Sequence, residues 1–289
     1  MSASRRTGNV PAFVPAFVSA FVPAFVPACV LALFVLTALT AQWIAPFDPA
    51  VSGDLVADRL LAPSTTHWFG TDASARDVFS RMLFGTQVSL GIAALSVAVV
   101  LLAGVTWGVI AGLAPAWLDG WMMRFVDALM ATPRLLVVLA CVAFTGRLSA
   151  TSLALLLGLT AWPAMSRIVR ARVRELDATD YVAAARALGA PRMRIAVRHI
   201  LPGVLPAAMV TAILTVASVI PLEAGLSYFG AGIAPPTASW GVLLQDASAR
   251  PLDAWWLLLF PSAAIAATVM SVNLLGERLR GRDRSLLAP

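Results

Sequence analysis

Two long stretches of this chain carry no charged side chain. They run from residue 7 to residue 47 and from residue 82 to residue 118. A helix needs roughly 20 apolar residues to cross a bilayer, where every backbone polar group must find its partner within the chain. Stretches of this length and character restrict the chain to membrane-spanning helices. We therefore expect an all-α, polytopic membrane protein.

The composition excludes several other classes of protein. Hydrophobic residues make up 60% of the chain and charged residues 12%, whereas soluble domains carry about a quarter charged residues. All 21 basic residues are arginine, so neither a Walker A lysine nor a Schiff-base lysine is present. Cys29 and Cys141 both lie in apolar runs, so we expect no disulfide framework and no metal site.

Hydropathy predicts six crossings within one transmembrane domain, residues 27–289. Before it, a Pro-Ala-Phe-Val repeat carries several prolines that oppose a regular helix, and we interpret residues 1–26 as an irregular, low-complexity leader. The predicted crossings are residues 27–46, 88–112, 122–145, 148–166, 204–222 and 254–276.

The arginines predict the orientation of these crossings. An even number of crossings puts both termini on one side of the membrane. With the N-terminus inside, the inner segments hold 15 arginines and the outer loops hold five. Basic residues concentrate on the cytoplasmic side, so we expect both termini in the cytoplasm. Because the arginines alternate with apolar spans, membrane lipid rather than nucleic acid is the expected partner.

The inner segment 167–201 is too long for a simple connection between two helices. Residues 178–188 are good helix formers, and Gly189 suits the left-handed position that ends a helix. Pro191 suits the start of a second short helix, which Pro202 is expected to close. That second helix is amphipathic and basic, so it fits either the surface of anionic lipid or a protein partner.

The spelling of this segment resembles the Glu-Ala-Ala loop of ABC importer permeases. "YVAAARALG" is followed nine residues later by "HILP", and Ala183 stands where that family has a glutamate. In the family this loop is a pair of short helices that docks on an ATPase subunit and transmits its motion. The resemblance assigns ATPase coupling to Ala183, Ala184, Ala185, Gly189, Arg192, Arg194, His199, Leu201 and Pro202.

Three further motifs resemble the dipeptide, oligopeptide and nickel branch of these permeases. "IAPFDP" spans residues 44–49, and "FGTDASARDVFSRMLFGTQVSL" spans 69–90 with Ala75 where glycine is usual. "EAGLSYFGAGIAPPTASWGVLL" spans 223–244. The resemblance as a whole covers about residues 40–280. Within the branch, the chain resembles the second, C-type permease of such systems.

This resemblance implies a bacterial inner-membrane subunit that forms half of a translocation pathway. Its implied partners are a second permease, two ATPase subunits and an extracytoplasmic substrate-binding protein. ATP and magnesium would bind the ATPases, leaving this chain without cofactor or catalytic residues. The implied cargo is a dipeptide, a longer peptide, a nickel complex or a peptide-like antibiotic.

Two other functions stay open at this point. An ion-driven secondary carrier would be expected to show inverted repeats or broken helices at the midplane. A coupling-defective subunit that acts only as an assembly scaffold is suggested by Ala183, which replaces the family's glutamate.

Charged residues near the membrane supply candidates for the pathway. Asp127 and Arg134 are seven residues apart, which places them on one face of a helix, and such charges inside a membrane suggest function. Alternatively, Asp127 lies at the inner interface and Arg134 reaches towards it. Glu223 either meets a cargo amino group or anchors the loop 223–253. The pathway and outer-loop candidates are Glu223, Ser227, Trp240 and Asp127.

The remaining polar and aromatic residues are expected to serve structure. We expect His199 to pack at the corner between the short helix and the membrane. The aspartates of residues 48–77 are expected to form a solvated or partner-facing surface. An aromatic belt at the outer interface is expected from Trp240, Trp255 and Trp256.

Overall fold

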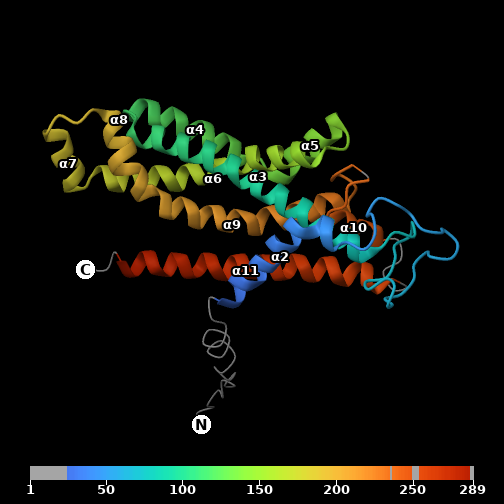
Figure 1. The fold of residues 1–289 in the computed structure, drawn as a ribbon. Helices are drawn as coiled ribbons and strands as arrows, with labels where there is room; N and C mark the ends of the chain where they lie inside the picture. The colour runs from blue at the N-terminus through green and yellow to red at the C-terminus, as the bar shows by residue number, and fades with distance from the viewer. Residues whose placement is uncertain (1–24, 235, 249–253, 287–289) are drawn as a thin grey trace, which may run out of the picture.

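The structure, a computed structural model, describes residues 25–234, 236–248 and 254–286. Its regular elements are helices, and the longest of them run side by side along one axis (Figure 1). In chain order they are α2 (Phe25–Ile44), α3 (Val78–Leu113), α4 (Ala116–Ala131), α5 (Arg134–Thr145), α6 (Ala150–Asp177), α7 (Asp180–Ala187), α8 (Arg192–Ile195), the π-helix η1 (Ala196–Ile200), α9 (Leu201–Tyr228), α10 (Trp240–Ser248) and α11 (Trp255–Leu286).

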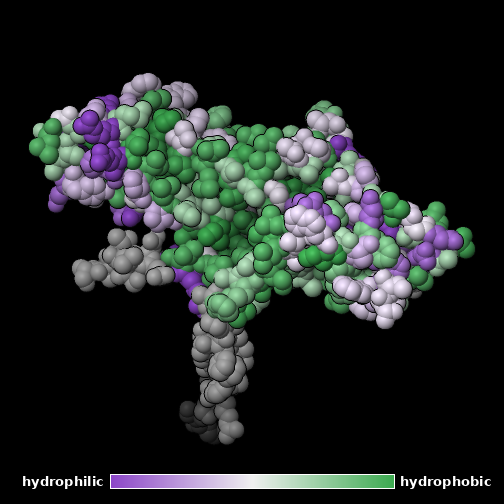
Figure 2. All heavy atoms as spheres, in the orientation of Figure 1, coloured by the Kyte–Doolittle hydropathy of each residue, from purple (hydrophilic) through white to green (hydrophobic). Residues whose placement is uncertain are grey.

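The helices are long and apolar enough to cross a membrane. Five of the described helical segments meet this criterion, and α4 with α5 makes a sixth if the bent pair counts as one span. Figure 2 shows an apolar middle between two ends where hydrophilic residues gather. One polar end carries α7 and α8, and the other carries the segment between α2 and α3 together with α10 (Figure 1).

Several helix bounds differ from those that hydropathy predicted. Helix α6 continues to Asp177, so residues 167–177 extend a span and do not belong to a loop. The predicted crossing 122–145 is not one helix, because the chain bends by 74° between α4 and α5. Pro133 causes this break, since proline disfavours a helical conformation in the residue before it. Of the predicted leader 1–26, only Phe25 and Val26 lie within the described residues, and they begin α2.

A row of glycines lets α3 and α6 approach each other closely. Gly104, Gly108 and Gly112 lie four residues apart on α3 and face α6. A Cβ atom added at Gly108 would lie 2.6 Å from the Cβ of Val169 and 2.7 Å from the carbonyl oxygen of Ser166. Small residues at this spacing allow helix backbones to meet in a membrane, where van der Waals packing replaces the hydrophobic effect.

The same interface continues towards the end of the bundle that carries α10. There Gly158 of α6 lies against Val99, and an added Cβ would lie 2.7 Å from the Cβ of Val99. Ser96 donates a hydrogen bond of 2.8 Å to the carbonyl oxygen of Ala154. The paired helices therefore form a rigid centre against which α9 and the other spans pack.

Gly108→Ala is expected to destabilise the protein by about 1–3 kcal/mol, because overpacking at a backbone contact forces the two helices apart. Gly91→Ala on the same helix is the matched control, since an added Cβ there meets nothing within 4 Å. The midpoint of unfolding in mixed detergent micelles measures both. Equal midpoints for the two variants would contradict the close-packing argument.

Candidate functional site

The two short helices α7 and α8 form a hairpin at one end of the bundle (Figure 1). Helix α7 ends in a Schellman motif, in which the backbone N–H of Gly189 donates to Arg186 at 2.9 Å and that of Ala190 donates to Ala185 at 3.1 Å. Gly189 has φ of +79°, so the predicted left-handed glycine is confirmed. Pro191 precedes α8 directly, as its fixed φ favours.

Two buried side chains and one ion pair attach this hairpin to the bundle. Val182 of α7 and Ile195 of α8 are buried in an apolar cluster with Val169 and Val173 of α6. Arg186 forms an ion pair with Asp177 at the end of α6. The hydroxyl of Tyr181 donates to the carbonyl oxygen of His199 at 3.4 Å. The hairpin is thus fixed both to the preceding and to the following span.

The outer surface of the hairpin is apolar and basic. Leu188 is 88% exposed and Met193 is 74% exposed, and both lie beside the turn at Gly189. Large exposed apolar groups of this kind mark contact surfaces. Ala183, Ala184, Arg192 and Arg194 are exposed on the same hairpin, whereas Ala185, His199 and Leu201 are half-buried.

The hairpin continues into α9 without a break. The segment Arg192–Tyr228 is helical throughout, so the expectation that Pro202 closes a separate helix is wrong. The π-helix η1 explains this, because the N–H of Leu201 reaches back to the carbonyl oxygen of Ala196. This wider turn accommodates Pro202, which has no N–H to donate.

An ionic cluster supports the same end of the bundle. Asp119 of α4 is buried and accepts hydrogen bonds from Arg170 at 2.5 and 2.6 Å and from Arg174 at 2.6 Å. The paired contact with Arg170 is the bidentate geometry that makes carboxylate–guanidinium pairs strong. Our sequence reasoning missed this cluster. Its only sequence signal is an aspartate at the start of a predicted span, facing an arginine-rich segment.

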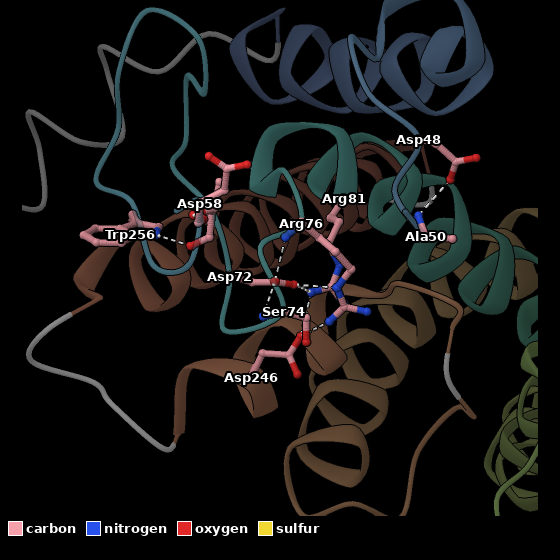
Figure 3. A network of polar contacts seen from close by, with 10 residues as sticks. Asp48, Ala50, Asp58, Asp72, Ser74, Arg76, Arg81, Asp246 and Trp256 are labelled. Carbon is pink, nitrogen blue, oxygen red and sulfur yellow. Dashed lines mark hydrogen bonds and ion pairs between the residues drawn. The ribbon is translucent and has the colours of Figure 1, made fainter. Parts of the chain in front are cut away.

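At the opposite end, Asp72 is the centre of a buried network (Figure 3). It accepts hydrogen bonds from the backbone N–H groups of Ser74 and Arg76, at 2.8 and 3.0 Å. Its other oxygen accepts from the guanidinium groups of Arg76 and Arg81. Arg81 also donates to Asp246 of α10 at 2.6 Å. The network joins the 69–90 motif to α10.

The prediction that the aspartates of residues 48–77 form one solvated or partner-facing surface is therefore wrong. Asp72 is fully buried, and Asp77 is buried where it caps α3 and pairs with His67 at 2.9 Å. Asp48 and Asp54 are exposed, and Asp58 is half-buried. There, backbone N–H groups of Val56 and Ala57 hold the pKa of Asp54 below its ordinary value.

Glu223, Ser227 and Trp240 meet in a second buried cluster at this end. Glu223 accepts hydrogen bonds of 2.8 Å from the hydroxyls of Ser227 and Ser239. Trp240 is fully buried, and its indole N–H donates to Thr86 of α3 at 3.2 Å. This geometry suits the anchoring of the segment after α9, and a role for these residues in the pathway stays a prediction.

The expected aromatic belt is wrong for two of its three members. Trp240 lies in the cluster just described, and the indole N–H of Trp256 donates to the carbonyl oxygen of Thr71 at 3.1 Å (Figure 3). Trp255 alone of the three is exposed, at 50%. The two buried rings are held by partners far away in the chain, which no local pattern reveals.

Asp127 and Arg134 lie on different helices and do not share a face, so that prediction is wrong. Asp127 is exposed and forms an ion pair with Arg167 at 3.6 Å. Arg134 begins α5 beyond the 74° bend and donates to Thr160 and Leu157 of α6. An arginine at the centre of a membrane span costs about 2.5–3.5 kcal/mol on insertion scales, so its retention calls for a reason.

The fold and the two polar ends define a multi-pass α-helical permease. It has a helical hairpin at one end and, at the other, a folded cap made of residues 45–77 and α10. Residues 104–282 match the family described as binding-protein-dependent transport system inner membrane component. The chain belongs to this family and is a permease component of such an ABC importer.

Relatives with related descriptions cover most of the chain. A putative peptide transport system permease protein of Brucella suis is 42% identical over 255 residues, which cover 87% of this chain and 83% of that protein. The nickel transport system permease protein NikC of Escherichia coli K12 is 36% identical over 255 residues, covering 87% and 90%. The inward-facing MetNI methionine ABC transporter shares the fold, with a TM-score of 0.54, 19% identity and coverage of 68% of this chain and 94% of that one.

Ala75 gives a direct test of the segment between α2 and α3. Its φ is +57°, a conformation that costs an L-residue about 1–2 kcal/mol, and glycine is usual here in the similar motif. Ala75→Gly relieves this strain, but glycine also adds conformational entropy to the unfolded chain. The net effect expected is a free energy of unfolding that is higher by up to about 1 kcal/mol. Ala73→Gly is the matched control and is expected to lower it by about 0.5–1 kcal/mol. Thermal unfolding of both variants measures the difference, and a loss at both positions would refute the strain at Ala75.

Proposed function

We propose that this chain forms half of the membrane pathway of a peptide importer and couples it to ATPase subunits through the hairpin of α7 and α8. The observation that carries this proposal is the continuity of the hairpin with α9. A partner that moves α8 must move a helix of 37 residues, Arg192–Tyr228, that crosses the bundle.

The hairpin has the properties of a lever. Coupling between two sites requires an element with defined arrangements that both sites can bias. The ion pair of Arg186 with Asp177 and the buried Val182 hold α7 against α6, and Ile195 holds α8 against the same cluster. The exposed Leu188 and Met193 then offer an apolar contact to a partner.

The partners follow from this arrangement. A second permease completes the pathway, two ATPase subunits bind ATP and magnesium and dock on the two hairpins, and an extracytoplasmic protein delivers cargo to the outer cap. In this proposal the chain catalyses no covalent step and holds no cofactor. The coupling residues are those of the hairpin, with Ala183 exposed where a docked ATPase would meet it.

Peptides are the cargo that the relatives favour. The Brucella protein with 42% identity is described as a peptide permease, and the Escherichia coli protein with 36% identity as a nickel permease. The higher identity supports a peptide, and a nickel complex is the alternative that uptake measurements separate.

Ala183 motivates a second candidate function, an assembly scaffold without transport. A glutamate at this exposed position would add a charged contact to the ATPase, and alanine cannot. Exposed ion pairs contribute only about 0–1 kcal/mol, so the loss of one is small. The two short helices, the glycine turn between them and the exposed Leu188 and Met193 are all present. We therefore favour the coupled permease.

Both termini are proposed to face the cytoplasm, with the hairpin on that side. The arginine distribution supports this orientation, and α11 ends at the same end of the bundle as the hairpin (Figure 1). Arg194 is exposed on the hairpin, so a cysteine introduced there (R194C) should react with a membrane-impermeant maleimide only after the cytoplasmic face is opened. Labelling of intact cells or spheroplasts would reverse the orientation.

Reconstitution tests the function itself. The chain is assembled in liposomes with its ATPases, second permease and binding protein, and uptake of a dipeptide pool is measured with and without ATP. Uptake that requires ATP is expected. Uptake driven by an ion gradient alone would indicate a carrier, and a stable complex without uptake would indicate a scaffold.

Gly189→Val tests the lever within that system. An added Cβ at Gly189 meets nothing within 4 Å, so the cost comes from φ of +79° alone. Backbone strain of about 1–3 kcal/mol should disturb the turn and lower ATP-driven uptake by tenfold or more, with membrane insertion unchanged. Gly189→Asn is the matched control, since asparagine tolerates this conformation better. Normal uptake by the valine variant would refute the lever.

A further inference from the structure

Arg134 is a cation without a counter-ion in the described part of the chain. Its Nε donates to the Thr160 hydroxyl at 3.1 Å, and one terminal nitrogen donates to the Leu157 carbonyl oxygen at 2.7 Å. Both acceptors are neutral. The nearest acidic residue along the chain, Asp127, pairs with Arg167 instead. A guanidinium has five N–H donors in a planar fork, so Arg134 keeps donors available for a further acceptor.

These donors belong to the wall of a cavity of about 460 Å³. This volume lies in the range of small-molecule sites, which combine apolar walls with a few polar groups. Hydroxyl groups supply the other polar lining, and each can accept or donate a hydrogen bond. The polar residues of the lining are Thr132, Arg134, Thr160, Thr215 and Ser218.

The cavity lies midway along the membrane-spanning helices. Thr215 is at the middle of α9, and Thr160 is within the apolar part of α6 that precedes Arg167. Figure 1 shows α5 leaving the end of α4 partway along the bundle, away from the hairpin. A lipid headgroup at the membrane surface is therefore remote from this cavity.

The start of α5 adds to the positive character of the site. Pro133 precedes α5, and no side chain caps the first N–H groups of that helix. Uncapped N–H groups and the helix dipole favour a negative charge at this end.

We propose that Arg134 is a specificity-determining residue that binds the carboxylate of the cargo during its passage through the membrane. The inference rests on the proposed function. It specifies the cargo further, as peptides with a free carboxyl terminus. A carboxylate accepts two parallel hydrogen bonds from a guanidinium and cancels its charge. A carboxylate of the second permease is the competing counter-ion, and the two sources predict different results.

The test compares two substrates in the reconstituted transporter. ATP-driven uptake is measured for a mixed dipeptide pool and for the same pool amidated at the carboxyl terminus, with wild-type chain and with Arg134→Gln. The wild type is expected to prefer the free acids. In the variant that preference is expected to fall about tenfold. Removal of the Arg134 guanidinium takes a charged hydrogen bond away from the free acids, whereas the amides have no carboxylate to lose one.

Arg167→Gln is the matched control, because it removes an arginine outside the cavity wall and should leave the preference unchanged. If Arg134→Gln lowers uptake of acids and amides equally, the counter-ion belongs to the second permease and the inference is wrong. If Arg134→Gln leaves both the preference and the uptake of each pool unchanged, the discrimination belongs to the binding protein, and this result also overturns the inference. Failure of the proposed function is distinct, since the wild-type assembly would then show no ATP-driven uptake of either pool.

Discussion

The close approach of α3 to α6 is the constraint on which the other features of the structure depend. Gly104 and Gly108 bring the two backbones together, and α6 then extends beyond the apolar layer to Asp177. This extension carries the hairpin. Val169 and Val173 pack both against α3 and within the cluster that holds α7 and α8, so the hairpin is in contact with the centre of the bundle. If α3 and α6 packed less closely, the hairpin would be less firmly connected to the other spans.

Polar networks at the two ends have the complementary task of holding the spans in register. Asp119 ties α4 to α6 at the hairpin end, and Asp72 with Arg81 ties the segment between α2 and α3 to α10 at the other. Between these ends Arg134 stands apart, since only neutral groups accept its hydrogen bonds. Buried pairs at the ends stabilise one arrangement, whereas the role that we propose for Arg134 is to bind a ligand that comes and goes.

Much of the fold could be predicted because membrane insertion is governed by local hydropathy. The class of protein, the family and the left-handed Gly189 all came from residues adjacent in the chain. Predictions that required distant contacts were wrong. Trp240 and Trp256 were assigned to a belt because exposed tryptophans favour interfaces, but Thr86 and Thr71 hold their indole groups inside. The shared face of Asp127 and Arg134 failed because one proline bends the span by 74°. The glycine spacing on α3 was present in the sequence and was overlooked.

Sequence by itself determined that this chain crosses a membrane several times, that its arginines favour one side, and that a glycine turn separates two short helices. These properties depend on hydrophobicity, on charge and on the conformational freedom of single residues. Among the described residues, tertiary structure alone decided which carboxylates are paired, which tryptophans are buried and which neutral groups accept the hydrogen bonds of Arg134. Such pairings depend on helices that meet across the bundle, as Arg134 of α5 meets Thr160 of α6, and no local pattern in the chain contains that distance.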